Sequence, residues 1–298
     1  MKIYERDFEK LARACIARFG NCDEHNYCHF LNLRTDTKMP VFIGFDNGFG
    51  MLALKQKNGK VWYGAREVLA PKKERARLLI EFAGYVLNHG AERVEVELEE
   101  DSRKGVVERL GSKGLRACKV SGVLDWPLFE MKDWDEKLAG GKWKKLRNIR
   151  NKFYKEHKVS AVGFKDADKN ELKRIVKEWK EERKGKDFAY AREYLNVIDS
   201  GFKGFDCVRI LVVDGKARAI TGGWKVPNTN HYYSSLGVYD YSIDRLGEIA
   251  NLDDLTYLKS RGYKLVNFGG SGKELLEFKN KFKPSSCYKT YIFSVKKK

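Results

Sequence analysis

The sequence lacks any apolar run approaching the roughly 20 residues that a membrane-spanning helix needs. Its N-terminus, Met1–Asp7, carries acidic side chains and no apolar segment, which is atypical of a secretory signal. We therefore expect a cytoplasmic protein without a membrane span. Cysteine is also scarce, with 6 in 298 residues, and this density is far below that of a disulfide scaffold.

Several catalytic signatures are missing as well. The chain contains no Gly-x-Ser-x-Gly elbow, no Walker phosphate loop and no dinucleotide fingerprint. One segment, Cys22–His29, does hold two cysteines and two histidines. Their spacing is not the paired-cysteine pattern of a zinc ribbon and no second ligand pair follows, so we expect no metal site.

Acidic residues are too few to balance the basic ones. The chain has 59 Lys and Arg against 41 Asp and Glu, which gives a formal net charge of +18. A surplus of this size indicates an anionic partner, which could be a nucleic acid, a nucleotide cofactor or an acidic membrane surface. The charge alone does not choose among these three.

Length and pattern predict two copies of one α/β unit. A chain of 298 residues suits two domains of about 150 residues each. Gly90 and Gly262 each end an expected helix and precede an expected strand, about 172 residues apart. We predict mixed sheets, an N-terminal domain over 1–130 and a C-terminal domain over 131–298. The repeated elements are the strand 60–64, helix 71–88 and strand 93–98, then the hairpin 208–224, strand 231–238, helix 246–260 and strand 266–268.

The end of the second repeat has the pattern of a site. A short apolar strand runs into Gly269, Gly270 and Ser271, and glycines at a strand end let the backbone approach a ligand closely. A helix end rich in lysine and phenylalanine follows, and its cations suit phosphate groups. The predicted phosphate-binding residues here are Lys279, Lys281 and Lys283.

The most basic segment lies between the two repeats. Eight cations between residues 142 and 158 face a single acid, Glu156, while apolar residues recur at helical spacing. Unopposed like charges destabilise a helix unless an anion is present, so Lys144, Arg147 and Arg150 are predicted to bind phosphates. A solvated charged helix is the alternative.

Two segments resemble known families. Residues 124–126, 144–152 and 158–159 resemble the central segment of the peptidoglycan-bridge aminoacyltransferases. Residues 251–284 resemble the family named for the C-terminal domain of phosphatidylglycerol lysyltransferase. Both families have tandem Gcn5-related N-acetyltransferase (GNAT) folds, so the resemblance implies two tandem GNAT-like domains. It covers roughly residues 120–298.

The resemblance implies transfer of an acyl group, often an aminoacyl group from charged tRNA, onto an amine or hydroxyl. No cofactor is implied beyond the acyl donor as co-substrate, either aminoacyl-tRNA or acyl-CoA, and the acceptor is unknown. Acetyl-CoA enzymes of this fold usually carry a Gln/Arg-x-x-Gly-x-Gly/Ala loop before their long helix. Neither residues 65–73 nor residues 240–247 contain it, which counts against ordinary acetyl-CoA binding.

Acyl transfer needs an oxyanion stabiliser and a way to remove a proton from the acceptor. Asp240 or Asp253 would orient or deprotonate the acceptor, although Asp253 also suits a helix start. Tyr232 could relay a proton, although strand packing would also explain it. Gly269–Ser271, and less strongly Gly222–Gly223, could line the reaction site.

Three functions are compatible with this pattern. The first is an aminoacyltransferase whose tRNA, or another polyanionic donor, lies in a cation-lined groove between the halves. The second is an acyl-CoA N-acyltransferase, and the third is a non-catalytic RNA-binding module on the same fold.

Overall fold

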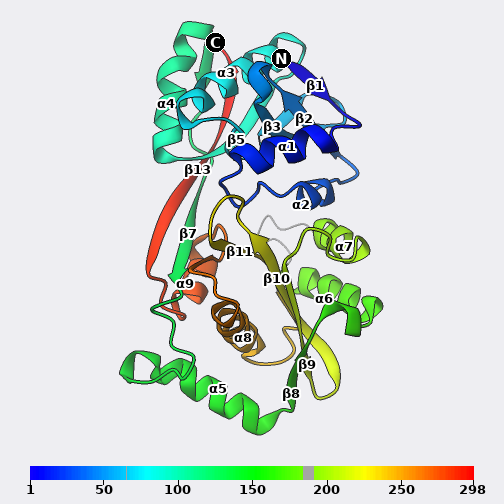
Figure 1. Cartoon of the computed structure of the whole chain (residues 1–298), viewed down its shortest axis with the longest axis vertical. Coiled ribbons are helices and arrows are strands. Elements are labelled where there is room, and N and C mark those ends of the chain that lie inside the picture. Colours follow the sequence, from blue (N-terminus) through cyan, green and yellow to red (C-terminus); the bar gives the residue numbers. More distant parts are fainter. Residues whose placement is uncertain (65, 184–190) are drawn as a thin grey trace.

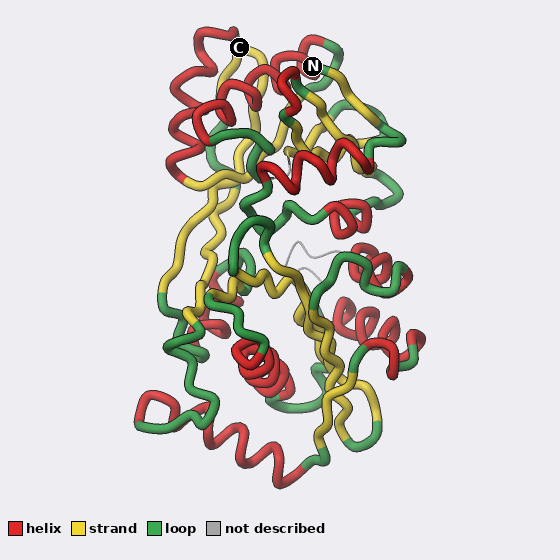
Figure 2. The backbone as a smooth tube through the Cα atoms, in the orientation of Figure 1, coloured by secondary structure: helices red, strands yellow, loops and turns green. Residues whose placement is uncertain are grey.

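The computed structural model describes residues 1–64, 66–183 and 191–298 and contains one mixed 13-stranded sheet (Figure 1). The strand order is β1-β2-β3-β4-β5-β13-β7-β12-β11-β10-β9-β8, with β6 paired to β13. Helices cover both faces of the sheet in the C-terminal half, as the tube view shows (Figure 2).

The strands are β1 (Lys2–Tyr4), β2 (Lys38–Gly44), β3 (Gly50–Gln56), β4 (Val61–Gly64), β5 (Arg93–Glu99), β6 (Leu115–Ala117), β7 (Gly122–Glu130), β8 (Val159–Val162), β9 (Cys207–Val213), β10 (Lys216–Lys225), β11 (His231–Tyr239), β12 (Leu265–Asn267) and β13 (Ser286–Lys297). The α-helices are α1 (Glu9–Phe19), α2 (Tyr27–Asn32), α3 (Lys72–Asn88), α4 (Glu100–Leu110), α5 (Lys144–Glu156), α6 (Lys169–Glu182), α7 (Ala191–Asp199), α8 (Leu246–Ser260) and α9 (Lys273–Asn280). No helix in the described ranges is long and apolar enough to cross a membrane.

The predicted repeat is confirmed. In the N-terminal half, β2, β3 and β4 are antiparallel neighbours, and α3 then leads to β5, which is parallel to β4. In the C-terminal half, β9, β10 and β11 are antiparallel neighbours, and α8 leads to β12, which is parallel to β11. The strands, the hairpin and both long helices lie where the periodicity predicted them, to within two residues.

The two halves are joined through the last strand of the chain. β13 pairs with β7 over Ser286–Ile292 and with β5 over Thr290–Val295, so its end lies in the N-terminal half. Figure 1 shows it rising from beside α9 to the end of the molecule where both termini lie. Phe293 and Val295 are buried in the N-terminal core, so residues from the far end of the chain complete the first domain.

Four apolar clusters of described residues hold the elements against the sheet, and one of them packs α1 and α2 on β2 and β3. The N-terminal cluster packs the inner faces of α3 and α4 on the strands. In the C-terminal half, α5 and α8 pack within one cluster and α6 and α7 within another. Full burial of one aliphatic side chain contributes about 1.5–3 kcal/mol, and the inner face of α8 supplies five such residues. These are Leu246, Ile249, Leu252, Leu255 and Leu258.

Candidate active site

The candidate site lies where the two parallel strands of the C-terminal half diverge. β11 and β12 pair over only three residues, from His231 with Leu265 to Tyr233 with Asn267. Beyond this point β11 continues along β10, while the chain after β12 turns away at Gly269. Ligands of open α/β sheets bind outside the carboxyl ends of parallel strands, and here the carboxyl end of β12 meets the N-terminal half, because Asn267 donates to Asp23.

The glycines after β12 have the steric role that the sequence predicted. Gly269 has φ +78°, a conformation that favours glycine, and an added Cβ would lie 3.4 Å from the Tyr233 ring. An added Cβ on Gly270 would lie 2.9 Å from Leu124 and 3.0 Å from Trp126. The backbone of Gly269 and Gly270 therefore packs against Tyr233, Leu124 and Trp126 so closely that it leaves little room for a side chain.

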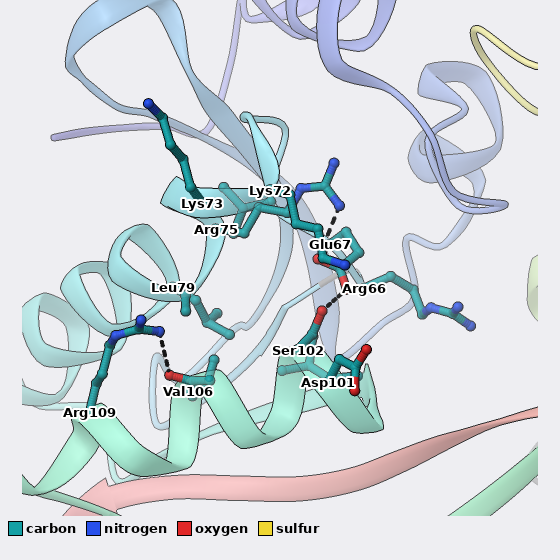
Figure 3. Close-up of a pocket in the computed structure, with 14 residues that line it drawn as sticks. Arg66, Glu67, Lys72, Lys73, Arg75, Leu79, Asp101, Ser102, Val106 and Arg109 are labelled. Atoms are coloured by element: carbon teal, nitrogen blue, oxygen red, sulfur yellow. Dashed lines mark hydrogen bonds and ion pairs between the residues drawn. The ribbon is translucent and has the colours of Figure 1, made fainter.

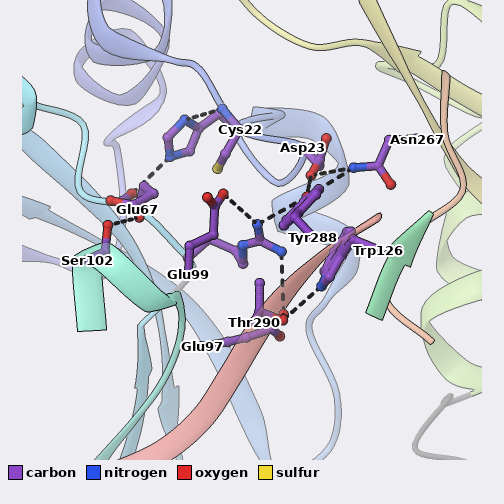
Figure 4. A network of polar contacts seen from close by, with 12 residues as sticks. Cys22, Asp23, Glu67, Glu97, Glu99, Ser102, Trp126, Asn267, Tyr288 and Thr290 are labelled. Atoms are coloured by element: carbon purple, nitrogen blue, oxygen red, sulfur yellow. Dashed lines mark hydrogen bonds and ion pairs between the residues drawn. The ribbon is translucent and has the colours of Figure 1, made fainter. Parts of the chain in front are cut away.

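Asn267, the last residue of β12, connects three segments at this point. Its side-chain nitrogen donates to Asp23 Oδ2 (3.0 Å) and to the Tyr288 hydroxyl (3.1 Å), and its oxygen accepts from the Gly269 N–H (2.8 Å). Tyr288, on β13, also donates to Asp23 Oδ2 (3.2 Å). Asp23 precedes α2, so these bonds tie the N-terminal half to the divergence point (Figure 4).

Arg66 is the cation at the centre of this network. Its side chain is 3% exposed and lies over Trp126, with the guanidinium carbon 4.2 Å from the ring centroid. It contacts Glu97 (3.4 Å) and Glu99 (3.9 Å). The backbone φ of Arg66 is +42°, which is unusual for a residue with a side chain. The unusual backbone of this loop and the contacts with Trp126, Glu97 and Glu99 together fix the position of the guanidinium.

Carboxylates outnumber this single arginine. Asp23, Glu24, Glu97 and Glu99 surround it, and burial raises the pKa of Asp23, Glu24 and Glu99. The pKa of Glu24 rises to about 7, first because of burial and then because Glu97 is near. Glu24 forms no hydrogen bond or ion pair with another described residue. The cluster can therefore accept one more cationic group.

Lys279 places an amine directly beside the glycine turn. Its Nζ donates to the main-chain carbonyls of Phe268 and Gly269 (3.1 Å to Gly269). Burial, followed by the nearby charge of Arg183, lowers the pKa of Lys279 to about 7. An amine with this pKa can donate a hydrogen bond to an oxyanion or exchange a proton at neutral pH. This buried position is not that of a surface lysine that binds phosphate.

Ser271 lies next to this turn, whereas Asp240 does not. The Ser271 hydroxyl donates to the Gly269 carbonyl (3.2 Å), and its backbone pairs with Asp125. Asp240 follows the far end of β11 and pairs with Arg218 (2.6 Å). Burial would raise the pKa of Asp240, but hydrogen bonds from Ser242 and the pair with Arg218 lower it. The carboxylate is thus ionised, and Arg218 balances its negative charge.

Tyr232 and Asp253 have interior partners. The Tyr232 hydroxyl donates to the Cys207 carbonyl (3.3 Å) and its side chain is fully buried. Asp253 accepts two hydrogen bonds from Arg209, at 2.5 and 2.8 Å. Tyr232 therefore points into the protein, away from any substrate, whereas the partly exposed Asp253 already has Arg209 as its ionic partner.

The predicted phosphate-binding cations do not share one groove, so that expectation is corrected. The region where the two halves meet, around Arg66 and Asn267, is called the junction below. α5 lies at the end of the C-terminal half that is remote from this junction (Figure 1). Arg147 donates to the carbonyls of Leu138 and Gly140, because the chain folds back over the start of α5. In the same way Arg150 binds the carbonyls of residues 136 and 137.

Three lysines of the predicted set differ in their surroundings. Lys144 is exposed at the start of α5. Lys281 pairs with Glu248 (2.8 Å), and Lys283 is exposed. Gly222 and Gly223 of β10 lie opposite a bulge in β11, where Ser235 is the extra residue. An added Cβ on Gly223 would lie 1.8 Å from the Tyr233 carbonyl oxygen, so close packing explains this pair.

Sequence reasoning missed Asp23, Glu24, Arg66 and Tyr288. In the sequence, the segment 22–29 was considered only as a possible metal site. In the structure, both ring nitrogens of His25 already have partners in the protein. Its Nδ1 accepts from the Asn21 N–H (3.1 Å) and its Nε2 lies 2.9 Å from the Glu67 carbonyl. Burial lowers the pKa of His25 to about 4, so it is a neutral structural residue. No cluster of three potential metal ligands occurs in the described part of the chain.

The fold and the divergent strands define the class. Three antiparallel strands, a helix and a parallel strand that diverges from its neighbour form a GNAT unit, and this chain contains two in tandem. The family model described as phosphatidylglycerol lysyltransferase, C-terminal, matches residues 32–293, and the chain belongs to this family. The chain is therefore an acyltransferase. A search of curated proteins found no match.

Solved structures support the same fold. The C-terminal domain of a lysylphosphatidylglycerol synthetase from Agrobacterium fabrum has a TM-score of 0.67 and 16% identity, over 96% of this chain and 90% of that one. FemX has a TM-score of 0.65 and 12% identity, over 99% and 97%. A tandem GNAT protein from the clavulanic acid pathway has a TM-score of 0.59 and 9% identity, over 99% and 97%.

Proposed function

We propose that this acyltransferase moves an aminoacyl group from charged tRNA to an amine or hydroxyl acceptor. The observation that carries the proposal is the surplus of carboxylates around Arg66, next to the glycine turn and Lys279. An aminoacyl group carries a free ammonium, which this acidic and aromatic cluster suits. An acetyl or fatty acyl group has no such cation and would leave the surplus of carboxylates around Arg66 uncompensated.

The chemistry needs few parts. The acceptor nitrogen or oxygen attacks the ester carbonyl, the bond from that carbon to the ribose oxygen breaks, and the acceptor proton ends on the ribose oxygen. Lys279 is proposed to stabilise the intermediate oxyanion and to pass this proton, as its pKa of about 7 suits both roles. Ser271 and Gly269 would line the reacting carbonyl. We do not assign a chemical step to Tyr232, Asp240 or Asp253.

The body of the tRNA is proposed to contact α5. Lys144 and Lys145 form no ion pair with any described residue and are exposed in its first turn. Lys155 is also exposed, near the other end of the helix. Cations that are free of acidic partners can neutralise phosphates without breaking a contact.

The test is transfer of a radiolabelled amino acid from charged tRNA to acceptors in a cell extract. Replacing Lys279 with Ala should lower the transfer rate by about 100-fold or more, the scale of losing one oxyanion donor. Lys283→Ala removes an exposed lysine four positions away and serves as the matched control. Equal rates for both variants would contradict the proposed role of Lys279.

Binding measurements on the same purified protein distinguish the proposed function from the two alternatives. Saturable binding of acyl-CoA without transfer from tRNA would favour an acyl-CoA N-acyltransferase. Salt-dependent tRNA binding without preference for the charged form, and without transfer, would indicate an RNA-binding module.

A further inference from the structure

Three tyrosines lie near the point where β11 and β12 diverge, and the protein itself binds the hydroxyls of two of them. The Tyr232 hydroxyl donates to a main-chain carbonyl (3.3 Å). The Tyr288 hydroxyl donates to Asp23 (3.2 Å) and accepts from Asn267 (3.1 Å). The hydroxyl of the half-buried Tyr233 has no hydrogen bond to any described residue. A polar group in such surroundings that lacks a protein partner is typically bound by water or by a ligand.

Strand alternation sends the two neighbouring tyrosines of β11 to opposite faces of the sheet. Tyr232 packs in the same apolar cluster as α5 and α8. The Tyr233 ring lies on the other face, where its centroid is 5.1 Å from that of Trp224 and 6.2 Å from that of Trp126. These two indoles hold the ring, so the hydroxyl at its tip has a fixed position.

The Tyr233 hydroxyl adjoins the glycine turn and is near the carboxylate cluster. An added Cβ on Gly269 would lie 3.5 Å from this hydroxyl, and the Gly269 carbonyl accepts from Lys279 (3.1 Å). Among charged groups, Glu24 and Asp23 act on Tyr233 most strongly. In an aminoacyl ester one carbon separates the ammonium from the carbonyl. An ammonium held by these carboxylates therefore places the carbonyl oxygen near the tyrosine hydroxyl.

The surroundings keep this phenol protonated. Burial, followed by the nearby charges of Glu24 and Asp23, raises the pKa of Tyr233 well above its ordinary value. The hydroxyl can therefore donate a hydrogen bond at neutral pH, but it cannot act as a general base.

The cavity between α3 and α4 lies apart from this hydroxyl. It measures about 180 Å³ and Arg66 is at its edge, but Figure 3 shows the Arg66 guanidinium pointing away from the cavity. The guanidinium overlies Trp126 and contacts Glu97. Because Tyr233 also packs against Trp126, it lies on the guanidinium side of Arg66. An acyl group beside Tyr233 therefore does not occupy the cavity.

We propose that Tyr233 is a catalytic residue whose hydroxyl donates a hydrogen bond to the carbonyl oxygen of the acyl donor. Negative charge develops on this oxygen when the acceptor attacks and disappears when the bond to the ribose oxygen breaks, so Tyr233 keeps its proton throughout. Lys279 is the second donor, since both groups adjoin Gly269. The aminoacyl ester rests on the proposed function, whereas this role of the hydroxyl applies to any ester or thioester carbonyl.

The test compares the two adjacent tyrosines in steady-state transfer from charged tRNA. Tyr233→Phe keeps the ring and should lower kcat by about 100-fold or more, the scale of one lost oxyanion donor, with little change in the KM for charged tRNA. Tyr232→Phe removes the neighbouring hydroxyl, which binds a main-chain carbonyl, and should keep the parent rate. Equal kcat values for Tyr233→Phe and the parent protein would overturn the proposal.

Thermal unfolding separates a catalytic hydroxyl from a structural one. Because the Tyr233 hydroxyl has no described partner in the protein, Tyr233→Phe should unfold at the temperature of the parent. Tyr288→Phe loses its bonds to Asn267 and Asp23 and should unfold at a lower temperature. If Tyr233→Phe lost both activity and thermal stability, the hydroxyl would be structural and the proposal would be wrong.

Two further measurements keep this proposal separate from the proposed function. If tRNA supports no transfer, the same variants are compared with acetyl-CoA as donor, where Tyr233→Phe should show the same loss. Transfer from acetyl-CoA alone would count against the proposed function and not against Tyr233.

The second measurement follows binding and needs no turnover. Protein labelled with ¹³C at the Cζ of its tyrosines is titrated with 3′-alanylamido-3′-deoxyadenosine, a stable analogue of an aminoacyl end, and separately with acetyl-CoA. The Tyr233 resonance is identified by its absence from Tyr233→Phe, and it should shift with at least one of the two ligands. A Tyr233 resonance that neither ligand shifts would refute contact between this hydroxyl and the acyl carbonyl.

Discussion

At the scale of single residues, Lys279 couples the candidate site to stability. Its pKa is lowered from 10.5 to about 7, so the unfolded chain binds this proton more tightly than the folded protein between these values. Stability should therefore rise with pH in this window. From pH 7 to pH 9 the free energy of unfolding should rise by about 2 kcal/mol relative to Lys279→Met. Urea denaturation of both proteins at the two pH values measures this, and parallel pH profiles would contradict the assigned pKa.

Among the residues at the junction, replacement of Arg66 should lower the free energy of unfolding most. Arg66→Met leaves Glu97 and the surrounding carboxylates buried without a cation, which typically costs about 3–5 kcal/mol. Its loss raises the pKa of Asp23, Glu24 and Glu99 further, so the cost should be larger at pH 8 than at pH 5, where protonation relieves it. Arg116→Met, on the exposed face of β6, should cost less than about 0.5 kcal/mol. An equally small cost for Arg66→Met in thermal or urea unfolding would show that the cluster needs no cation.

At the scale of elements, β13 makes the first half depend on the last residues of the chain. Phe293 is buried in the N-terminal core and its strand pairs with β5. Phe293→Ala should therefore cost about 3–5 kcal/mol. Val123→Ala, on the neighbouring strand β7 and 42% exposed, should cost less than about 1 kcal/mol. Hydrogen exchange resolved by residue should show the loss of protection in β5; protection lost only in the C-terminal half would refute this coupling.

The elements were largely predictable from the sequence, and the site only partly. The helix 246–260 and the hairpin around Asp214–Gly215 follow from local periodicity and turn chemistry, which act over a few residues. The glycine turn was predictable for the same reason. Arg66 and Asp23 carry no local pattern, because they are more than 200 residues from Asn267 in sequence and meet it only in the folded chain, where Asp23 and Tyr288 of β13 both bond Asn267. Lys279 was predicted as a phosphate ligand because sequence does not reveal that its amine turns inward to main-chain carbonyls.

At the scale of the whole molecule, the reacting centre and the basic helix are separate regions. The junction lies between the halves, and α5 lies at the opposite end of the C-terminal half (Figure 1). A helix of 13 residues is about 20 Å long, so its cations can contact several phosphates of an extended RNA. A donor held at both places would use α5 for affinity and the junction for chemistry. Binding and catalysis should therefore be separable by mutation.

The variant Lys144→Ala, Lys145→Ala, Lys155→Ala tests this separation. It should weaken tRNA binding and reduce the slope of log affinity against log salt by about 2, since each lost phosphate contact removes about 0.7–0.9. Transfer from an aminoacylated oligonucleotide limited to the 3′ end of tRNA should stay unchanged, because this donor is too short to reach α5. A Lys165→Ala, Lys169→Ala, Lys177→Ala variant, which removes three exposed lysines in and just before α6, controls for net charge. If transfer from the short donor fell as much as transfer from whole tRNA, α5 would belong to the reacting centre and the two-region arrangement would be wrong.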